Sequence, residues 1–230
     1  MVVKIDDDQR PVYRHIDVAC EAHPRYRRQG PWARLDYALC LLSEEFPDKM
    51  PLLQPTSDRA PTANDPISYS WKEALVRFER LSLDARDAYY RLGDERSRWV
   101  LLAGMGCTDR NLSIRAEGIG QLSEGLSLIT QRDLLRLTAG AQGRRDSATI
   151  CQGDSGGAAF RVLTADRHGP RRIIAINSTN IVIAGRVQQV SFLIKTSAPP
   201  FVEFFRSWRR RHNEPKVCGI DIEIDDRCHA

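Results

Sequence analysis

One serine in the second half of the chain stands in a run of small residues whose types suit acyl transfer. The run reads Cys151-Gln152-Gly153-Asp154-Ser155-Gly156-Gly157. Glycine permits backbone conformations closed to other residues. A tight loop here would turn the amides of Gly153 and Ser155 to one side of the hydroxyl, and two such amides are the parts of an oxyanion hole. Asp154 could order the loop by accepting a charge-assisted hydrogen bond. The alternative is an ordinary glycine-rich turn between strands.

Residues 153–157 resemble the Gly-Asp-Ser-Gly-Gly signature of the chymotrypsin/trypsin-like serine peptidases at every position. Ala158 then stands where that family usually has proline. Residues 23–26 and 35–39 resemble the family's His-Pro-Xaa-Tyr and Asp-Ile-Ala-Leu segments, in the same chain order. Weaker similarities follow at residues 100–106, where Met105 replaces a tryptophan between glycines, at 174–178 and at 191–211. The resemblance covers roughly residues 1–211.

The resemblance implies roles for two side chains and two amides. In such enzymes a serine attacks a peptide carbonyl, a histidine takes its proton, and an aspartate orients the histidine. On this resemblance Ser155 is the nucleophile, Asp36 is the orienting carboxylate, and the amides of Gly153 and Ser155 stabilise the oxyanion. The alternative for Asp36 is a surface aspartate at the start of a strand.

The resemblance also indicates which residues line the substrate cleft. Thr149, six positions before the serine, falls at the base of the specificity pocket, where neither Asp nor Glu stands. We therefore expect a neutral or small substrate side chain rather than Arg or Lys. Gln152, Ser178 and Asn180 complete the predicted substrate-binding residues. The expected partner is a peptide or protein substrate, with no cofactor and no metal.

A catalytic histidine cannot be assigned in this chain. The template places it roughly 45 residues before the aspartate, and Asp36 leaves no room for that spacing. His23 is interpreted as a turn residue. The other histidines lie in unsuitable settings: His15, His168, His212 and His229. We expect the chain to begin just downstream of the family's histidine, and two causes stay open: an incomplete sequence or a genuine pseudo-enzyme.

Two functions follow from these observations. The first is a serine endopeptidase homologue that hydrolyses peptide bonds through an acyl-enzyme on Ser155. The second is an inactive pseudo-peptidase that binds extended peptides or proteins by pairing with a strand edge.

The predicted fold is all-β, with two six-stranded antiparallel β-barrels of the chymotrypsin type, the first of them incomplete. Residues 1–50 are the remnant of the first barrel, and 51–98 are a connector with an amphipathic surface helix near 71–92. Residues 99–211 are the second barrel and a terminal helix, which begins at Pro199-Pro200 with an apolar face. Residues 212–230 are a tail.

Composition excludes several other classes of protein. Hydrophobic residues make up 42% of the 230, as in globular proteins, and the longest apolar runs are strand-sized. The net charge is only +4, and the one basic cluster, at 206–211, is interpreted as a solvated helix face. No nucleic-acid or membrane partner is expected, and the oligomeric state stays open.

Cysteines and the N-terminus bear on the cellular location. The chain opens without a signal peptide, so an extracellular or periplasmic location is expected only if a longer precursor carries one. In the fold that the resemblance implies, Cys20 lies beside Cys40 and Cys107 near Cys151, which leaves Cys218 and Cys228 for the tail. Free buried thiols are the alternative.

Overall fold

The computed structural model describes most of the chain in short stretches. These are residues 2–5, 11–13, 16–26, 35–43, 49–55, 69–75, 78–88, 98–104, 123–140, 148–150, 153–163, 170–183, 188–222 and 228. Two compact units are present. The first comprises Met1–Cys20 with Cys40–Phe78, and the second comprises Glu21–Leu39 with Glu79–Ala230.

The described part of the first unit consists of two-stranded sheets. Strand β1 (Val2–Ile5) pairs antiparallel with β2 (Pro11–Tyr13), and β5 (Lys49–Pro55) pairs antiparallel with β6 (Tyr69–Leu75). A third sheet, formed by β3 (Val18–Ala22) and β4 (Ala38–Leu42), has residues assigned to both units. The predicted disulfide between Cys20 and Cys40 joins these two strands. Of the two predicted barrels, the first is not seen among the described residues of this unit.

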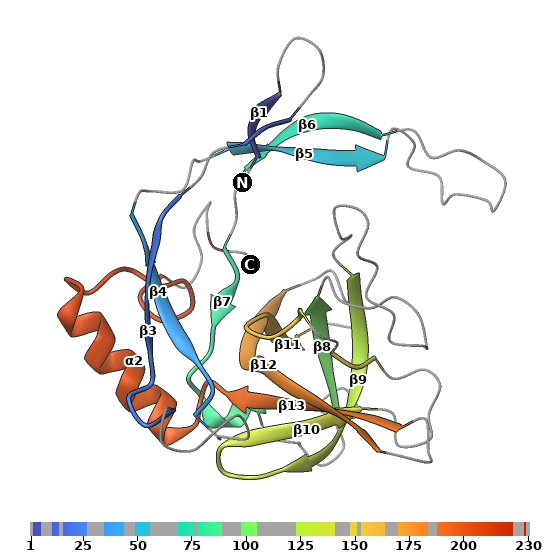
Figure 1. Ribbon diagram of the computed structural model, residues 1–230, viewed down its shortest axis with the longest axis vertical. Coiled ribbons are helices and arrows are strands. Elements are labelled where there is room, and N and C mark those ends of the chain that lie inside the picture. Colours follow the sequence, from blue (N-terminus) through green and yellow to red (C-terminus); the bar gives the residue numbers. More distant parts are fainter. Residues whose placement is uncertain are drawn as a thin grey trace, which may run out of the picture. The chain divides into compact units, whose positions relative to one another are not determined.

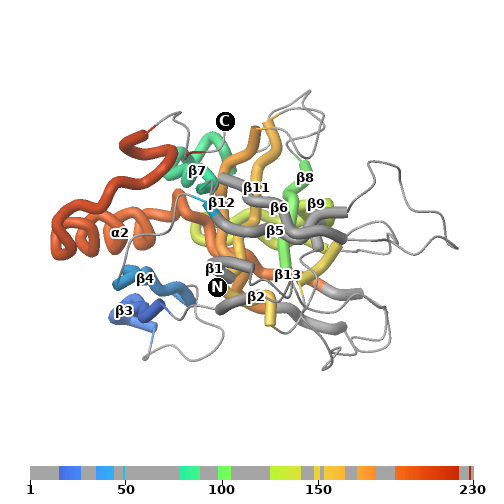
Figure 2. Tube along the Cα trace, turned by 90° about the horizontal axis from the view of Figure 1, so that it is seen from above, coloured from blue at the N-terminus to red at the C-terminus, as the bar shows by residue number. Residues whose placement is uncertain are grey.

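The second unit contains a closed six-stranded antiparallel barrel (Figures 1 and 2). Around the barrel the order is β11-β8-β9-β10-β13-β12, and β12 pairs back with β11. A seventh strand, β7 (Arg80–Leu81), lies parallel to β12. The barrel strands are β8 (Trp99–Gly104), β9 (Ser123–Arg132), β10 (Arg136–Gly140), β11 (Ala158–Val162), β12 (Arg171–Ile183) and β13 (Gln188–Lys195).

Apolar side chains at alternate positions of the strands form one core inside the barrel. Val100 and Leu102 on β8 and Leu137 and Ala139 on β10 belong to it, as expected when every second residue of a strand faces the same side. The other members are Ile150, Ala159, Ile174, Ala175 and Leu193. The prediction of an antiparallel barrel in this half of the chain is therefore confirmed.

The terminal helix α2 (Pro199–Arg211) has the predicted bounds. Proline suits the first helical turn because its missing N–H would have no intrahelical acceptor there. Four aromatic side chains of the helix are buried: Phe201, Phe204, Phe205 and Trp208. Phe201, Phe204 and Phe205 pack in a second apolar cluster with Leu35, Tyr37, Ile194 and Ala198. Three arginines in the last turn lie where the helix dipole favours positive charge.

The prediction of a surface helix near 71–92 is wrong for the described residues of this range. Tyr69–Leu75 is β6, which pairs with β5 along its whole length, and a single 3₁₀ turn, η1 (Ala85–Ala88), follows β7. The apolar spacing suggested a helix, but cross-strand pairing decides the conformation of such a segment. Farther on, the Ser82 hydroxyl accepts the Asp84 N–H, and the Asp84 carboxylate accepts the Arg86 N–H. Such side-chain bonds to the backbone compete with an α-helix.

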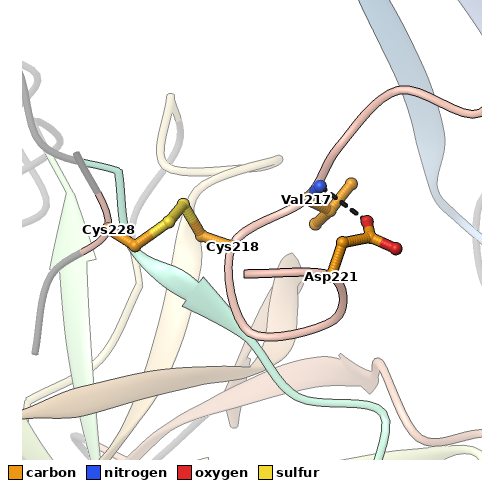
Figure 3. Close-up of a disulfide and its surroundings, with 4 residues drawn as sticks. All are labelled: Val217, Cys218, Asp221 and Cys228. Carbon is orange, nitrogen blue, oxygen red and sulfur yellow. Dashed lines mark hydrogen bonds between the residues drawn. A yellow bond between two sulfur atoms is a disulfide. The ribbon is translucent and has the colours of Figure 1, made fainter. Parts of the chain in front are cut away.

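The tail is fastened to the second unit. Figure 3 shows the Cys218–Cys228 disulfide beside the turn that ends at Asp221, whose carboxylate accepts the Val217 N–H at 2.9 Å. The Leu81 N–H on β7 donates to the Cys218 carbonyl at 2.8 Å. The predicted tail pair is thus present, whereas Cys107 and Cys151 lie outside the described residues. Within the described part of the chain, no helix has the length and apolarity needed to cross a membrane.

Candidate functional site

Ser155 lies at the tip of a short loop that leads into β11. Gly153 and Gly156 have φ angles of +99° and +86°, in the region that favours glycine, and they let the chain turn on both sides of Ser155. The Ser155 residue is exposed, and the Asp154 residue beside it is only 8% exposed. The loop therefore presents a hydroxyl to solvent above a buried carboxyl group.

Strand β12 holds this loop in place through Asn177. The Gly156 N–H donates to the Asn177 carbonyl, and the Asn177 N–H donates to the Gly157 carbonyl, both at 2.8 Å. The Asn177 side chain is 1% exposed, and its Nδ2 donates to the Ala103 carbonyl on β8 at 3.2 Å. Sequence reasoning did not select Asn177. The signal that could have found it is its position: Asn177 is the first polar residue after the apolar stretch Ile173–Ile176.

Ser178 links the predicted nucleophile to the predicted carboxylate. The Ser155 hydroxyl donates to the Ser178 backbone carbonyl at 2.8 Å, and the Ser178 hydroxyl donates to Asp36 Oδ2, also at 2.8 Å. Ser178 is buried, whereas Asp36 is partly exposed. The structure therefore brings Ser155 and Asp36, 119 positions apart in the sequence, to the two sides of one buried serine within the second unit.

Asp154 is packed against β8 at Gly104. A Cβ added to Gly104 would overlap the Asp154 carboxyl group, and its Oδ2 would lie only 2.7 Å away. The Asp154 backbone carbonyl accepts the Gly157 N–H at 3.1 Å, which closes the turn around Ser155. This arrangement agrees with the loop-ordering role predicted for Asp154, which stays a prediction.

The two amides predicted to form the oxyanion hole, those of Gly153 and Ser155, donate to no backbone carbonyl of the described residues. Both residues are exposed. Amides without an internal acceptor beside an exposed hydroxyl are what stabilisation of a developing oxyanion requires.

The comparisons with known proteins assign no family. No protein-family model matches the chain. No curated protein matches it either. What the site does must therefore be argued from its own geometry.

Of the remaining predicted binding residues, Thr149 and Asn180 lie on segments beside β13. Thr149 is partly buried just before Ile150, whose N–H donates to the Ser191 hydroxyl at 3.0 Å. Asn180 stands on β12 opposite Ser191 of β13. Gln152 lies outside the described residues. These positions place Thr149 and Asn180 on segments that adjoin the same strand, and their roles toward substrate stay predictions. Among the described residues, no group of His, Cys, Asp or Glu could hold a metal ion.

The two described histidines, His23 and His212, form no hydrogen bond with Ser155 or Asp36. His23 is buried, and its ring meets Tyr37 and Phe204 edge-on at centroid distances of 5.2 and 5.4 Å. Its Nδ1 accepts the Arg25 N–H at 3.2 Å, as expected of a turn residue. His212 Nε2 contacts Glu21 at 2.6 Å. His15, His168 and His229 lie outside the described residues.

The burial of His23 predicts a loss of stability in mild acid. Desolvation, with Arg25 nearby, holds the pKa of His23 below its ordinary value of 6.5. The unfolded chain therefore binds this proton more readily. The stabilising contribution is complete above about pH 6.5 and is lost as the pH falls toward the lower pKa of the folded protein.

The measurement is urea denaturation between pH 5 and 8, which spans this window. We expect the native protein to lose more stability than His23→Phe on going from the upper to the lower pH. Equal losses in the native protein and His23→Phe would show that His23 does not titrate as argued.

Proposed function

We propose that the Ser155 loop is the nucleophile centre of a chymotrypsin-type serine endopeptidase, which cleaves peptide bonds through an acyl-enzyme on Ser155. The observation that carries the proposal is the continuous connection from Ser155 through Ser178 to Asp36, with hydrogen bonds of 2.8 Å on each side. The proposal includes the two-barrel architecture of that family, with a substrate that binds as an extended peptide.

The chemistry divides between a nucleophile, two amides and a base. Ser155 Oγ attacks the carbonyl carbon of the peptide and gives its proton to the base, while the Gly153 and Ser155 amides stabilise the oxyanion. The base returns the proton to the leaving amine as the C–N bond breaks, and water then hydrolyses the ester. The described residues supply no such base, and an imidazole would have to enter between Ser155 and Asp36.

Asp36 is suited to receive that imidazole. Its Oδ2 accepts the Ser178 hydroxyl, whereas Oδ1 accepts no hydrogen bond from the described residues. A partly exposed carboxylate with one free oxygen can accept an N–H and stabilise the imidazolium that forms during acylation. The Ser155 hydroxyl must then leave the Ser178 carbonyl and donate to the imidazole instead.

The test is covalent labelling of the full chain with a fluorophosphonate probe, followed by intact-mass and peptide mass spectrometry. Ser155 Oγ displaces fluoride from phosphorus, and the base takes the proton. Without added base we expect little labelling. Added imidazole should raise the labelling rate of Ser155 at least about tenfold, because a positioned base contributes on the order of 10²–10⁴ in rate.

Ser155→Ala is the matched control and should take up no probe at any imidazole concentration. Labelling spread over other serines, or a Ser155 rate that does not respond to imidazole, would contradict the proposal. Tight binding of extended peptides together with such an unresponsive Ser155 would instead support the peptide-binding alternative.

A further inference from the structure

Three arginines lie side by side on three neighbouring strands of the second unit. Arg161 on β11 is paired with Arg172 on β12, and Arg172 is paired with Arg80 on β7. Residues directly opposite each other on neighbouring strands place their side chains on the same face of the sheet. The three guanidinium groups therefore share one face, at the end of the barrel near the 3₁₀ turn η1.

These positive charges are largely removed from water. Arg80 and Arg161 are each 8% exposed. The Nε atoms of Arg80 and Arg172 are buried without a hydrogen-bond partner. Within the described part of the chain, the Arg80 guanidinium has no ion pair. Leaving a buried charged donor without an acceptor costs more than leaving it in water.

Asp87, the carboxylate beside these three arginines, already accepts hydrogen bonds. Asp87 Oδ2 accepts the Ser82 hydroxyl at 2.6 Å and Arg172 Nη1 at 3.1 Å. The Asp87 backbone carbonyl accepts Arg161 Nε at 2.9 Å. Asp87 thus engages Arg172 and Arg161 and leaves the Arg80 guanidinium without a counter-charge among these contacts.

Two other carboxylates close to Arg80 in the sequence form ion pairs with other arginines. Glu79, next to Arg80 in the chain, forms an ion pair with Arg171 at 2.6 Å. Asp84 forms one with the exposed Arg86 at 2.7 Å. Like charges directly opposite each other on neighbouring strands destabilise a sheet. A further anion would therefore stabilise this row of three paired arginines.

We propose that Arg80 and Arg172, with Arg161 beside them, form a binding site for a tetrahedral oxyanion such as phosphate or sulfate. The planar guanidinium group can donate two parallel N–H groups to two oxygens of such an ion. The Arg172 side chain, 33% exposed, lies at the solvent side of the row. The site is separate from Ser155, so it does not depend on the proposed peptidase function.

The experiment measures binding of inorganic phosphate and of sulfate to the full chain by isothermal titration calorimetry. The buffer is chloride at constant ionic strength. We expect saturable binding of one ion per chain. Acetate, a planar monoanion, should bind at least about tenfold more weakly, because it offers fewer oxygens and less charge to the two guanidinium groups.

Arg80→Gln should weaken phosphate binding at least about tenfold, since it removes the guanidinium that lacks a counter-charge. Arg206→Gln, an exposed helix position, makes the same change in net charge and should leave binding within about twofold. Absence of saturable phosphate and sulfate binding to the native protein would overturn the site. So would equal affinities for the native protein and a folded Arg80→Gln.

Discussion

Replacing Phe201 with alanine is expected to lower the free energy of unfolding by about 3–5 kcal/mol, the usual cost of removing a buried phenylalanine ring. Phe201 is 1% exposed and lies at the centre of the cluster between α2 and the rest of the second unit. Its ring meets Tyr37 edge-on at a centroid distance of 5.1 Å and stacks on Phe205 at 6.1 Å. Urea denaturation at pH 7.5 measures the effect.

The Phe201→Ala substitution is also expected to lower the reactivity of Ser155. Tyr37 follows Asp36 directly, and the Tyr37 ring is held by Phe201 and Phe204. Loss of the Phe201 ring frees the segment that carries Asp36, so imidazole-dependent labelling of Ser155 should fall even under conditions where the variant stays folded. Val202→Ala, a partly buried neighbour on the helix, is the control. Equal destabilisation by both substitutions would contradict the packing described.

Replacing Gly104 with alanine is expected to disable the serine loop. The new Cβ would occupy the space of the Asp154 carboxyl group, and forcing extra volume into a packed region costs about 1–3 kcal/mol. Asp154 must then move, and Ser155 moves with it. We expect the rate of Ser155 labelling in the presence of imidazole to fall at least about tenfold, because a small displacement of a reacting group slows the reaction strongly.

Gly153→Ala separates overlap from backbone strain. Gly153 has a positive φ, but a Cβ there would meet nothing within 4 Å. Its cost should therefore be limited to the roughly 1–2 kcal/mol of a left-handed conformation. If Gly104→Ala labels as fast as the native protein, Asp154 does not hold the loop. The labelling rate of Ser155 and the free energy of unfolding in urea, measured on the same samples of both variants, distinguish overlap with Asp154 from backbone strain.

Much of the second unit could be predicted from local residue patterns. Pro199-Pro200 followed by spaced aromatic residues predicted α2 with its observed bounds. The antiparallel barrel predicted within residues 99–211 is present, and the period-two patterning of strands is a local property. The glycines around Ser155 predicted a tight loop, and the structure gives two of them positive φ angles.

The rest depends on partners distant in the sequence. Tyr69–Leu75 forms a strand because β5 is beside it, which the spacing of its own apolar residues cannot reveal. Residues 21–39 belong with the later part of the chain because Leu35 and Tyr37 pack on α2. The bonds from Asn177 to the serine loop and the pairing of Arg80 with Arg172 likewise join segments that are distant in the sequence.

In the proposed peptidase, Ser155 and Asp36 act on the same base. The most direct test of this joint action compares imidazole-dependent labelling of Ser155 in the native protein and in Asp36→Asn, which keeps the shape of the side chain but removes its charge. In the native protein the labelling rate should increase with imidazole concentration. In Asp36→Asn the slope of this increase should be at least about tenfold smaller, because the amide no longer stabilises the imidazolium. Identical slopes for the two proteins would mean that the carboxylate has no part in activating Ser155.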